Sequence, residues 1–225
     1  DFCLSRGLGD VYKRQGANVV FADANLDAVV QGSAFGIFHN QGQACIAASR
    51  LIVHESVADE LLERFIALAR SIRIGDPLDP ATEMGPLTSR HHRDRVLSYV
   101  DVAREQGGRI MSGGKAPDSA ALSNGCYVEP TIVAAKPTDR VSQEEVFGPF
   151  VTVSTFGSDE EALAIANGTE YGLGAGMWTR DLQRAHLFAR QLKSGMVWIN
   201  CYKRVSPASP FGGVGSSGYG LSLIH

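Results

Sequence analysis

Residues 50–71, RLIVHESVADELLERFIALARS, join a short apolar run to a longer amphipathic one. The run 50–55 predicts a buried strand. Ser56 is a candidate N-cap for the helix that follows. That helix presents apolar side chains at helical spacing, namely Val57, Leu61, Leu62, Phe65, Ile66 and Ala69. This strand followed by a helix indicates a chain in which strands and helices alternate.

The same alternation continues outward from this unit in both directions. Upstream, residues 25–38 carry apolar side chains at an approximate helical period. Downstream, a helix is expected over 89–106, ended by Gly107 and Gly108. The remaining elements are expected in alternation: strands 127–135, 150–156, 174–179 and 195–200, and helices from Ser158 to Gly168 and from Asp181 to Gly195. This order predicts the α/β class, with a mostly parallel sheet flanked by helices.

The composition is that of an ordinary globular protein and argues against several classes of function. With a net charge of −3, the chain lacks a strong electrostatic footprint for nucleic acid or anionic lipid. No apolar run approaches the roughly 20 residues that span a bilayer, so no membrane segment is expected. The four cysteines, Cys3, Cys45, Cys126 and Cys201, form no CxxC pair, so neither a metal site nor a disulfide scaffold is expected. A reducing compartment, the cytoplasm, fits best.

The two ends differ from the rest of the chain. Residues 1–15, DFCLSRGLGDVYKRQ, have neither helical nor strand periodicity and do not resemble a signal peptide. The sequence begins without Met and stops at LSLIH. We therefore expect residues 1–15 and 221–225 to be foreign sequence around a fragment of a longer protein, residues 16–220. A genuine but irregular amino-terminal arm is the alternative.

The stretch FHNQGQACIAASR, residues 38–50, places Cys45 after a polar loop that contains glycine. The thiolate is the form that attacks carbon, and it forms more readily where a thiol is partly exposed near backbone donors. Addition to an aldehyde would give a thiohemiacetal whose alkoxide can expel hydride and leave a thioester. Backbone N–H groups near Cys45 would stabilise that alkoxide. Taken alone, a single cysteine is more often a small buried apolar residue.

Two later stretches carry further candidate residues. In QEEVFGPF, residues 143–150, Glu144 and Glu145 precede a Phe-Gly-Pro turn, where a carboxylate can accept hydrogen bonds from a ribose diol, and Phe147 offers a flat apolar face. VWINCY, residues 197–202, leads into a loop rich in Gly, Ser and Pro, where Trp198 and Phe211 would line an apolar pocket. In isolation, an exposed pair of glutamates and two core aromatics are the simpler explanations.

The histidines carry less information. His39 neighbours the Cys45 loop, but proximity in sequence does not establish the hydrogen bond that a Cys–His pair needs. We expect His39 to pack against the fold or face solvent. His91 and His92, at the start of a helix, are expected to be polar surface residues.

Taken together and in this order, the three stretches resemble the aldehyde dehydrogenase superfamily. FHNQGQACIAASR resembles its active-site signature, QEEVFGPF resembles its cofactor-ribose motif, and WIN with SPFGG resembles a stretch near its carboxyl terminus. The resemblance covers about residues 16–220 and implies the catalytic-domain fold of that family.

The resemblance also implies a function for the parent protein. It would be an NAD- or NADP-dependent enzyme, a homo-oligomer, that oxidises a small-molecule aldehyde to a carboxylic acid. Cys45 would be the nucleophile, and its backbone N–H an oxyanion donor. Glu145 and Phe147 would contact the cofactor. The expected substrate-channel residues are Phe38, Trp198 and Phe211.

This sequence departs from the family pattern at several positions. The family carries a general-base Glu shortly before GAN, which is residues 16–18 here, and Val11 stands in its place. Because that Glu activates the water that cleaves the thioester, we expect little or no turnover from this chain. His92 stands where some members place a Gln that touches a ribose, and this role is not carried over. Gly215 replaces a Lys that is common in the last motif.

Three other functions are compatible with the same residues. One is an acylating relative that releases acyl-CoA or acyl phosphate, or that runs in reverse as a reductase. Another is a cysteine hydrolase, which needs no cofactor. The third is a non-catalytic oligomerisation or scaffold fragment, in which Cys45 would be inert toward alkylation.

Overall fold

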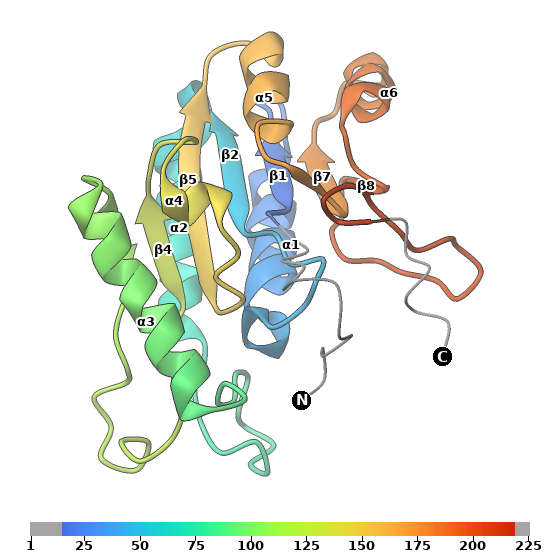
Figure 1. The fold of residues 1–225 in the computed structure, drawn as a ribbon. Coiled ribbons are helices and arrows are strands. Elements are labelled where there is room, and N and C mark those ends of the chain that lie inside the picture. The colour runs from blue at the N-terminus through green and yellow to red at the C-terminus, as the bar shows by residue number, and fades with distance from the viewer. Residues whose placement is uncertain (1–14, 219–225) are drawn as a thin grey trace.

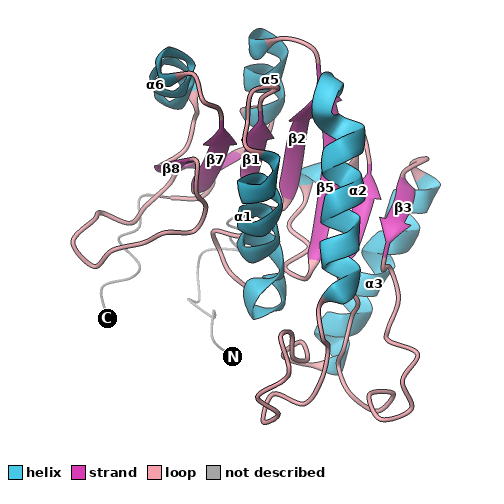
Figure 2. Ribbon diagram, turned by 180° about the vertical axis from the view of Figure 1, so that it is seen from behind, coloured by secondary structure: helices cyan, strands magenta, loops and turns pink. Residues whose placement is uncertain are grey.

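A computed structural model describes residues 15–218 of the chain (Figure 1). The segments expected to be foreign, 1–15 and 221–225, lie outside this range except for Gln15. Cys3 and Val11 also lie outside it. The described residues fold around one large sheet with helices on both faces (Figures 1 and 2).

The large sheet has seven strands in the order β3-β4-β5-β2-β1-β7-β8. They are β1 (Ala17–Val20), β2 (Arg50–His54), β3 (Arg109–Ser112), β4 (Thr131–Ala134), β5 (Phe150–Phe156), β7 (Gly174–Trp178) and β8 (Met196–Ile199). Neighbouring strands are parallel except for β3 with β4, which confirms the mostly parallel sheet. A short antiparallel pair, β6 (Tyr171–Gly172) with β9 (Val214–Gly215), ties the last loop to the fold.

Helices cover both faces of this sheet. They are α1 (Leu26–Phe38), α2 (Glu55–Ser71), α3 (Arg90–Glu105), α4 (Arg140–Gln143), α5 (Asp159–Ala166) and α6 (Leu182–Gln191). Figure 2 shows α1 and α2 side by side on one face, while Figure 1 shows α3 and α5 on the other. The helix α6 packs against β7 and β8. Among residues 15–218, no helix combines the length and the apolar character needed to cross a bilayer.

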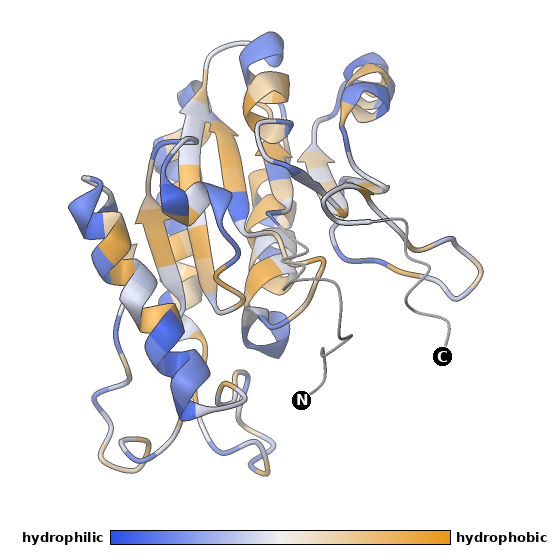
Figure 3. Cartoon of the chain, in the orientation of Figure 1, coloured by the Kyte–Doolittle hydropathy of each residue, from blue (hydrophilic) through white to orange (hydrophobic). Residues whose placement is uncertain are grey.

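Alternating side chains of the strands fill a core layer on each side of the sheet. Val20 and Val53 pack with residues of α1 and α2, whereas Val19 and Ile52 pack with residues of α5 and α6. All four side chains are fully buried. Figure 3 shows apolar colour along the central strands and a mixture of polar and apolar colour on the helices. Burial on both faces explains why these strands are apolar runs in the sequence.

The structure corrects two details of the expected elements. His54, not Ser56, caps α2, and its Nδ1 accepts the N–H of Ser56 at 3.2 Å. The strand β4 starts at Thr131 rather than at residue 127, because its partner β5 starts at Phe150, directly opposite Thr131. The strands β1 and β3, of four residues each, were not among the expected elements.

Candidate active site

Cys45 lies in the connection between α1 and β2. A turn encloses it, in which the N–H of Ala47 donates to the carbonyl of Ala44 at 3.0 Å. The N–H of Ala48 donates to the carbonyl of Gly36 at 3.2 Å and ties this turn to α1. The Cys45 side chain is half-buried. Because β1, β2 and β5 are parallel, the connection lies at the edge of the sheet where these strands begin.

Three successive residues of the Cys45 loop have a left-handed backbone. Asn40, Gln41 and Gly42 have φ angles of 56°, 54° and 68°. Such angles are easy for glycine but cost other residues roughly 1–2 kcal/mol. Asn40 holds the loop in this shape: its carbonyl accepts the N–H of Gln43 at 2.9 Å, and its Nδ2 donates to the carbonyl of Gln43 at 2.9 Å. The polar loop before Cys45 therefore has a defined conformation.

Gly42 brings the first two sequence motifs into contact. A Cβ atom at Gly42 would lie 1.9 Å from the carbonyl oxygen of Gly148 and 2.9 Å from the nitrogen of Pro149. Both distances are too short for any side chain, so the two backbones pack directly on one another. The loop of Cys45 and the Phe-Gly-Pro segment, about a hundred residues apart in the chain, are therefore neighbours in the fold.

The residues 144–147, called here the Glu–Phe turn, link α4 to the segment that enters β5. Glu145 is 9% exposed, and Phe147 is half-buried with a left-handed φ of 59°. Two side chains of α3 hold the main chain of this turn. Arg95 donates to the carbonyl of Glu145 at 3.0 Å, and Nε2 of His92 lies 2.7 Å from the carbonyl oxygen of Phe147.

The neighbouring carboxylate, Glu144, has a different environment. Arg140 donates to both of its oxygens at 2.8 Å, and the hydroxyl of Tyr99 donates at 2.9 Å. The hydrogen bonds from Arg140 lower the pKa of Glu144, and the Tyr99 hydroxyl adds to this effect against the opposing cost of burial. Glu144 is therefore held in an ion pair with Arg140 and a hydrogen bond from Tyr99.

The aromatic residues of the third motif pack beside the Cys45 loop. Trp198 is 7% exposed, and its Nε1 donates to the carbonyl of Arg204 at 2.6 Å. Its ring and the side chain of Ile46 both lie within 4 Å of the position that a Cβ would take on Gly174. Phe211 is half-buried and packs against the same core cluster as Cys45.

Phe38 does not belong with these residues. It is only 3% exposed, and its ring stacks on Phe65 of α2 with centroids 5.7 Å apart and planes 18° apart. It thus fills the core between α1 and α2. We correct the expectation that Phe38 lines a channel, because a side chain fixed in this helix interface packs against core residues instead.

Two residues, His92 and Gln15, make contacts near the site that the sequence did not predict. His92 was expected on the surface, but its ring reaches the Glu–Phe turn. Gln15, expected in the foreign segment, is 3% exposed, and Arg50 Nε donates to its carbonyl at 3.0 Å. The hydroxyl of Ser49 also donates to the Gln15 side chain. The signal for His92 was its place in the family pattern, at a Gln that touches a ribose in some members, whereas nothing local marked Gln15.

His39 lies beside the loop, as its position in the sequence suggests. Its carbonyl accepts from Nζ of Lys203 at 3.4 Å, and its ring contacts Phe35 with centroids 4.7 Å apart. Burial lowers the pKa of His39, and the charge of Lys203 lowers it further. The expected packing role of His39 agrees with these contacts.

Comparison with known proteins gives a consistent result. The model of the aldehyde dehydrogenase family matches residues 15–224. The chain is 41% identical, over 206 residues, to the chloroplastic betaine aldehyde dehydrogenase of Amaranthus hypochondriacus. This match covers 91% of the chain and 41% of that protein, so the chain spans less than half the length of the curated relatives it matches.

Solved structures agree with the sequence comparison. A putative aldehyde dehydrogenase from Burkholderia cenocepacia is 72% identical, with a TM-score of 0.91 over 92% of this chain and 42% of that one. PnpE from Pseudomonas sp. WBC-3 is 71% identical with the same TM-score and coverage, and PnpE has also been solved in complex with nicotinamide adenine dinucleotide. With the family model matching residues 15–224 and this fold shared at such identity, the chain belongs to the aldehyde dehydrogenase family.

Proposed function

We propose that the parent protein oxidises an aldehyde to a carboxylic acid with NAD or NADP, and that Cys45 is its nucleophile. The observation that carries this proposal is the contact of Gly42 with Gly148. It sets the loop of a half-buried thiol against the turn that bears Glu145 and Phe147. A covalent nucleophile and candidate cofactor contacts are thus neighbours, as an oxidation through a thioester requires.

The residues of the Glu–Phe turn fit a nicotinamide dinucleotide. The carboxylate oxygens of a glutamate such as Glu145 accept hydrogen bonds, which suits the two hydroxyls of a ribose. Phe147 is half-buried and presents an aromatic ring, which suits a flat heterocycle. PnpE, with the same fold at 71% identity, has been solved with this cofactor. We assign Glu145 and Phe147 as cofactor contacts on this basis.

The chemistry at Cys45 follows from the thiol itself. The thiolate adds to the carbonyl carbon of the aldehyde, and the carbonyl electron pair moves onto the oxygen. The backbone N–H of Cys45 donates to this oxyanion. NAD or NADP, when bound, supplies the acceptor for the hydride that leaves the same carbon. Loss of the hydride leaves a thioester on Cys45, and water cleaves it to the carboxylic acid and the thiol.

Trp198 and Phe211 remain our candidates for the substrate channel of this enzyme. Both are aromatic; Phe211 is half-buried, and the Trp198 ring shares the space beside Gly174 with Ile46, the residue after Cys45. Val205, in the adjoining loop, is 61% exposed. These side chains favour an aldehyde with an apolar aliphatic or aromatic body. A reducing compartment such as the cytoplasm would keep the Cys45 thiol reduced and therefore reactive. We also propose that the parent protein is a homo-oligomer, and light scattering of the full-length protein would measure its oligomeric state.

Alkylation of Cys45 tests the proposal directly on this chain. Cys45, Cys126 and Cys201 are all half-buried, so exposure alone predicts similar rates. We expect iodoacetamide at neutral pH to modify Cys45 fastest, as followed by mass spectrometry of its peptide. Equal rates at the three thiols, or an inert Cys45, would support a scaffold fragment instead.

Turnover by the purified chain separates the remaining alternatives. With NAD and a panel of aldehydes, we expect little or no sustained formation of reduced cofactor. Sustained turnover at about 1–1000 per second would contradict this expectation. Hydrolysis of an activated ester that needs no cofactor and is lost in Cys45→Ala would identify a cysteine hydrolase, and acyl transfer to coenzyme A or phosphate would identify an acylating relative.

A further inference from the structure

We propose that α3 is a positioning element for the Glu–Phe turn, and that His92, Arg95 and Tyr99 hold this turn in its binding conformation before any cofactor is present. The inference rests on the proposed role of the turn in contacting the cofactor. The three residues, called here the α3 ladder, are positioning residues because they act through the turn.

The α3 ladder reaches the turn from one side of the helix, because its members are spaced by three and four residues. Nε2 of His92 lies 2.7 Å from the carbonyl oxygen of Phe147. A carbonyl can only accept, so the histidine donates from Nε2. Arg95 donates to the carbonyl of Glu145 at 3.0 Å. Both bonds end on backbone oxygens, so they fix the path of the main chain.

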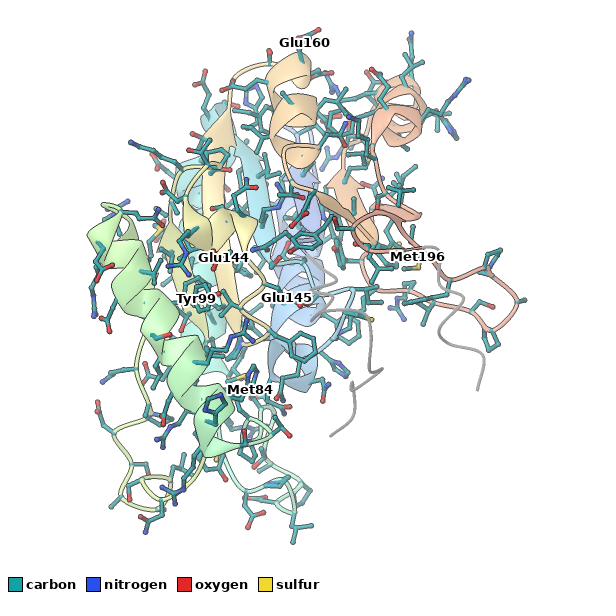
Figure 4. All side chains as sticks on the ribbon, viewed as in Figure 1. Met84, Tyr99, Glu144, Glu145, Glu160 and Met196 are labelled. Atoms are coloured by element: carbon teal, nitrogen blue, oxygen red, sulfur yellow. The ribbon has the colours of Figure 1, made fainter. Side chains whose placement is uncertain are left out.

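The third member of the ladder acts on the start of the turn. The hydroxyl of Tyr99, a residue only 7% exposed, donates to the Glu144 carboxylate at 2.9 Å. Figure 4 shows Tyr99 and Glu144 close together beside α3, with Glu145 next to them. The guanidinium of Arg95 lies 5.9 Å from the centre of the Tyr99 ring, which links the second and third members. Arg140 holds the same carboxylate from α4.

The backbone of Phe147 explains why the turn needs such support. Its φ of 59° lies in the left-handed region, where a bulky residue persists only if its surroundings impose the conformation. His92 bonds to the carbonyl of this residue, and the two rings are in contact with centroids 6.0 Å apart. A Cβ on the next residue, Gly148, would lie 2.7 Å from Val96 of α3. Side chains of α3 thus contact both the backbone of Phe147 and the space beside Gly148.

If the Glu–Phe turn already has its binding conformation, less conformational entropy is lost when a ligand binds. The proposal therefore concerns the cofactor-free chain, and it is tested there without any activity. Two measurements report on the turn. Hydrogen exchange of the amides of residues 144–150 reports how often it opens. The Cα and Cβ chemical shifts of Phe147 report whether its backbone is left-handed.

Three substitutions in the full 225-residue chain each remove the hydrogen bond of one ladder residue to the turn: His92→Leu, Arg95→Met and Tyr99→Phe. We expect each to speed exchange in residues 144–150 by about tenfold, the effect of losing one net hydrogen bond, while amides of α2 keep their rates. We expect the Phe147 shifts to move away from left-handed values in His92→Leu. His92→Gln, whose side-chain amide can still donate, is expected to restore both readouts.

A coupling experiment links His92 to the strained backbone. Glycine adopts the left-handed region without penalty, so Phe147→Gly removes the cost of the backbone conformation that His92 holds in place. We expect His92→Leu to speed exchange of the turn less in the Phe147→Gly background than in the original chain. The matched controls are His91→Leu and Arg104→Met, which change exposed side chains of the same helix.

Three results would overturn the proposal. They are unchanged exchange and unchanged Phe147 shifts in all three ladder variants, a uniform rise in exchange over the whole chain, or equal effects of the control variants. If the ladder variants have no effect on exchange, the predicted alkylation of Cys45 is unaffected. If Cys45 proves inert, the predicted exchange of the Glu–Phe turn is unaffected. The two proposals therefore fail separately.

Discussion

Phe35 and Phe38 lie three residues apart on α1, but only one of them is in the core. Phe35 is 43% exposed, whereas Phe38 is 3% exposed and stacks on Phe65. We expect Phe38→Ala to lower the free energy of unfolding by about 3–5 kcal/mol, the usual cost of removing a buried phenylalanine. Urea denaturation checks this, with Phe35→Ala as the control that changes it by less than about 1 kcal/mol. Equal losses would mean that Phe38 is not a core residue.

Asp23 ties the end of β1 to the start of α6. Its carboxylate accepts from the hydroxyl of Thr179 at 2.8 Å and from the N–H groups of Arg180 and Asp181 at 2.8 and 3.0 Å. Burial raises the pKa of this carboxyl, but these hydrogen bonds outweigh it and hold the pKa below 3.8. The ionised form therefore stabilises the fold above that ordinary pKa, and the contribution is lost as pH falls through the lowered pKa.

We expect Asp23→Asn to destabilise the chain at pH 7 by about 1 kcal/mol, a modest value because the side chain is 34% exposed and partly screened by solvent. Below the lowered pKa, the difference from the original chain should shrink. Midpoints of urea denaturation, measured from pH 7 down to below the pKa of Asp23, check the prediction. Asp101→Asn, an exposed residue paired with Arg104 on α3, is the control and should show little effect at any pH. A loss that does not depend on pH would contradict the assignment.

At the scale of elements, the contact between the Cys45 loop and the Phe-Gly-Pro segment requires that residue 42 is glycine and has no side chain. Gly42 and Gly107 both have positive φ, of 68° and 79°, but only Gly42 has a backbone neighbour at the Cβ position. Gly107→Ala should therefore cost about 1 kcal/mol for the backbone alone. Gly42→Ala should cost clearly more, because the methyl group would overlap the carbonyl of Gly148.

Two measurements check the glycine pair. Urea denaturation gives the two losses of stability, and alkylation gives the rate at Cys45 in each variant. We expect Gly107→Ala to leave the alkylation rate unchanged and Gly42→Ala to change it, since only the second shifts the loop. If Gly42→Ala and Gly107→Ala lose the same stability and give the same alkylation rate, the shape of the Cys45 loop does not depend on its contact with the Phe-Gly-Pro segment.

At the scale of the whole molecule, the candidate site lies where β1, β2 and β5 begin. Ligands of open parallel sheets usually bind at the opposite edge, outside the carboxyl ends of the strands. This chain spans only 41–42% of the length of the relatives that it matches. We infer that the remaining part of such proteins supplies the rest of the site.

A chimaera tests this inference. It joins the part of PnpE that precedes its match to Gln15 to residues 15–218 of this chain, which is 71% identical to PnpE. We expect it to oxidise aldehydes with NAD at about 1–1000 per second, and Cys45→Ala to abolish the activity. Cys201→Ala, which removes another half-buried thiol, should keep it. Activity that survives Cys45→Ala would refute the assignment of the nucleophile.

The sequence by itself determined the α/β class and most of the longer helices and strands, because the signals for them are local. Burial on both faces makes each central strand an apolar run, and the caps Ser89, Ser158 and Asp181 bond to amides three residues away. The sequence also singled out Cys45 and the Glu–Phe turn, through the resemblance to a family. Their roles in the reaction remain proposals.

Only the tertiary structure decided how these segments meet. The fit of Gly42 on Gly148, the reach of His92 to Phe147 and the burial of Phe38 against Phe65 each join residues that lie apart in the chain. No local pattern records such contacts, because they depend on how helices pack on the sheet and on which side of a helix faces it. The physical reason is that close packing and backbone strain are set by the neighbours that folding brings together.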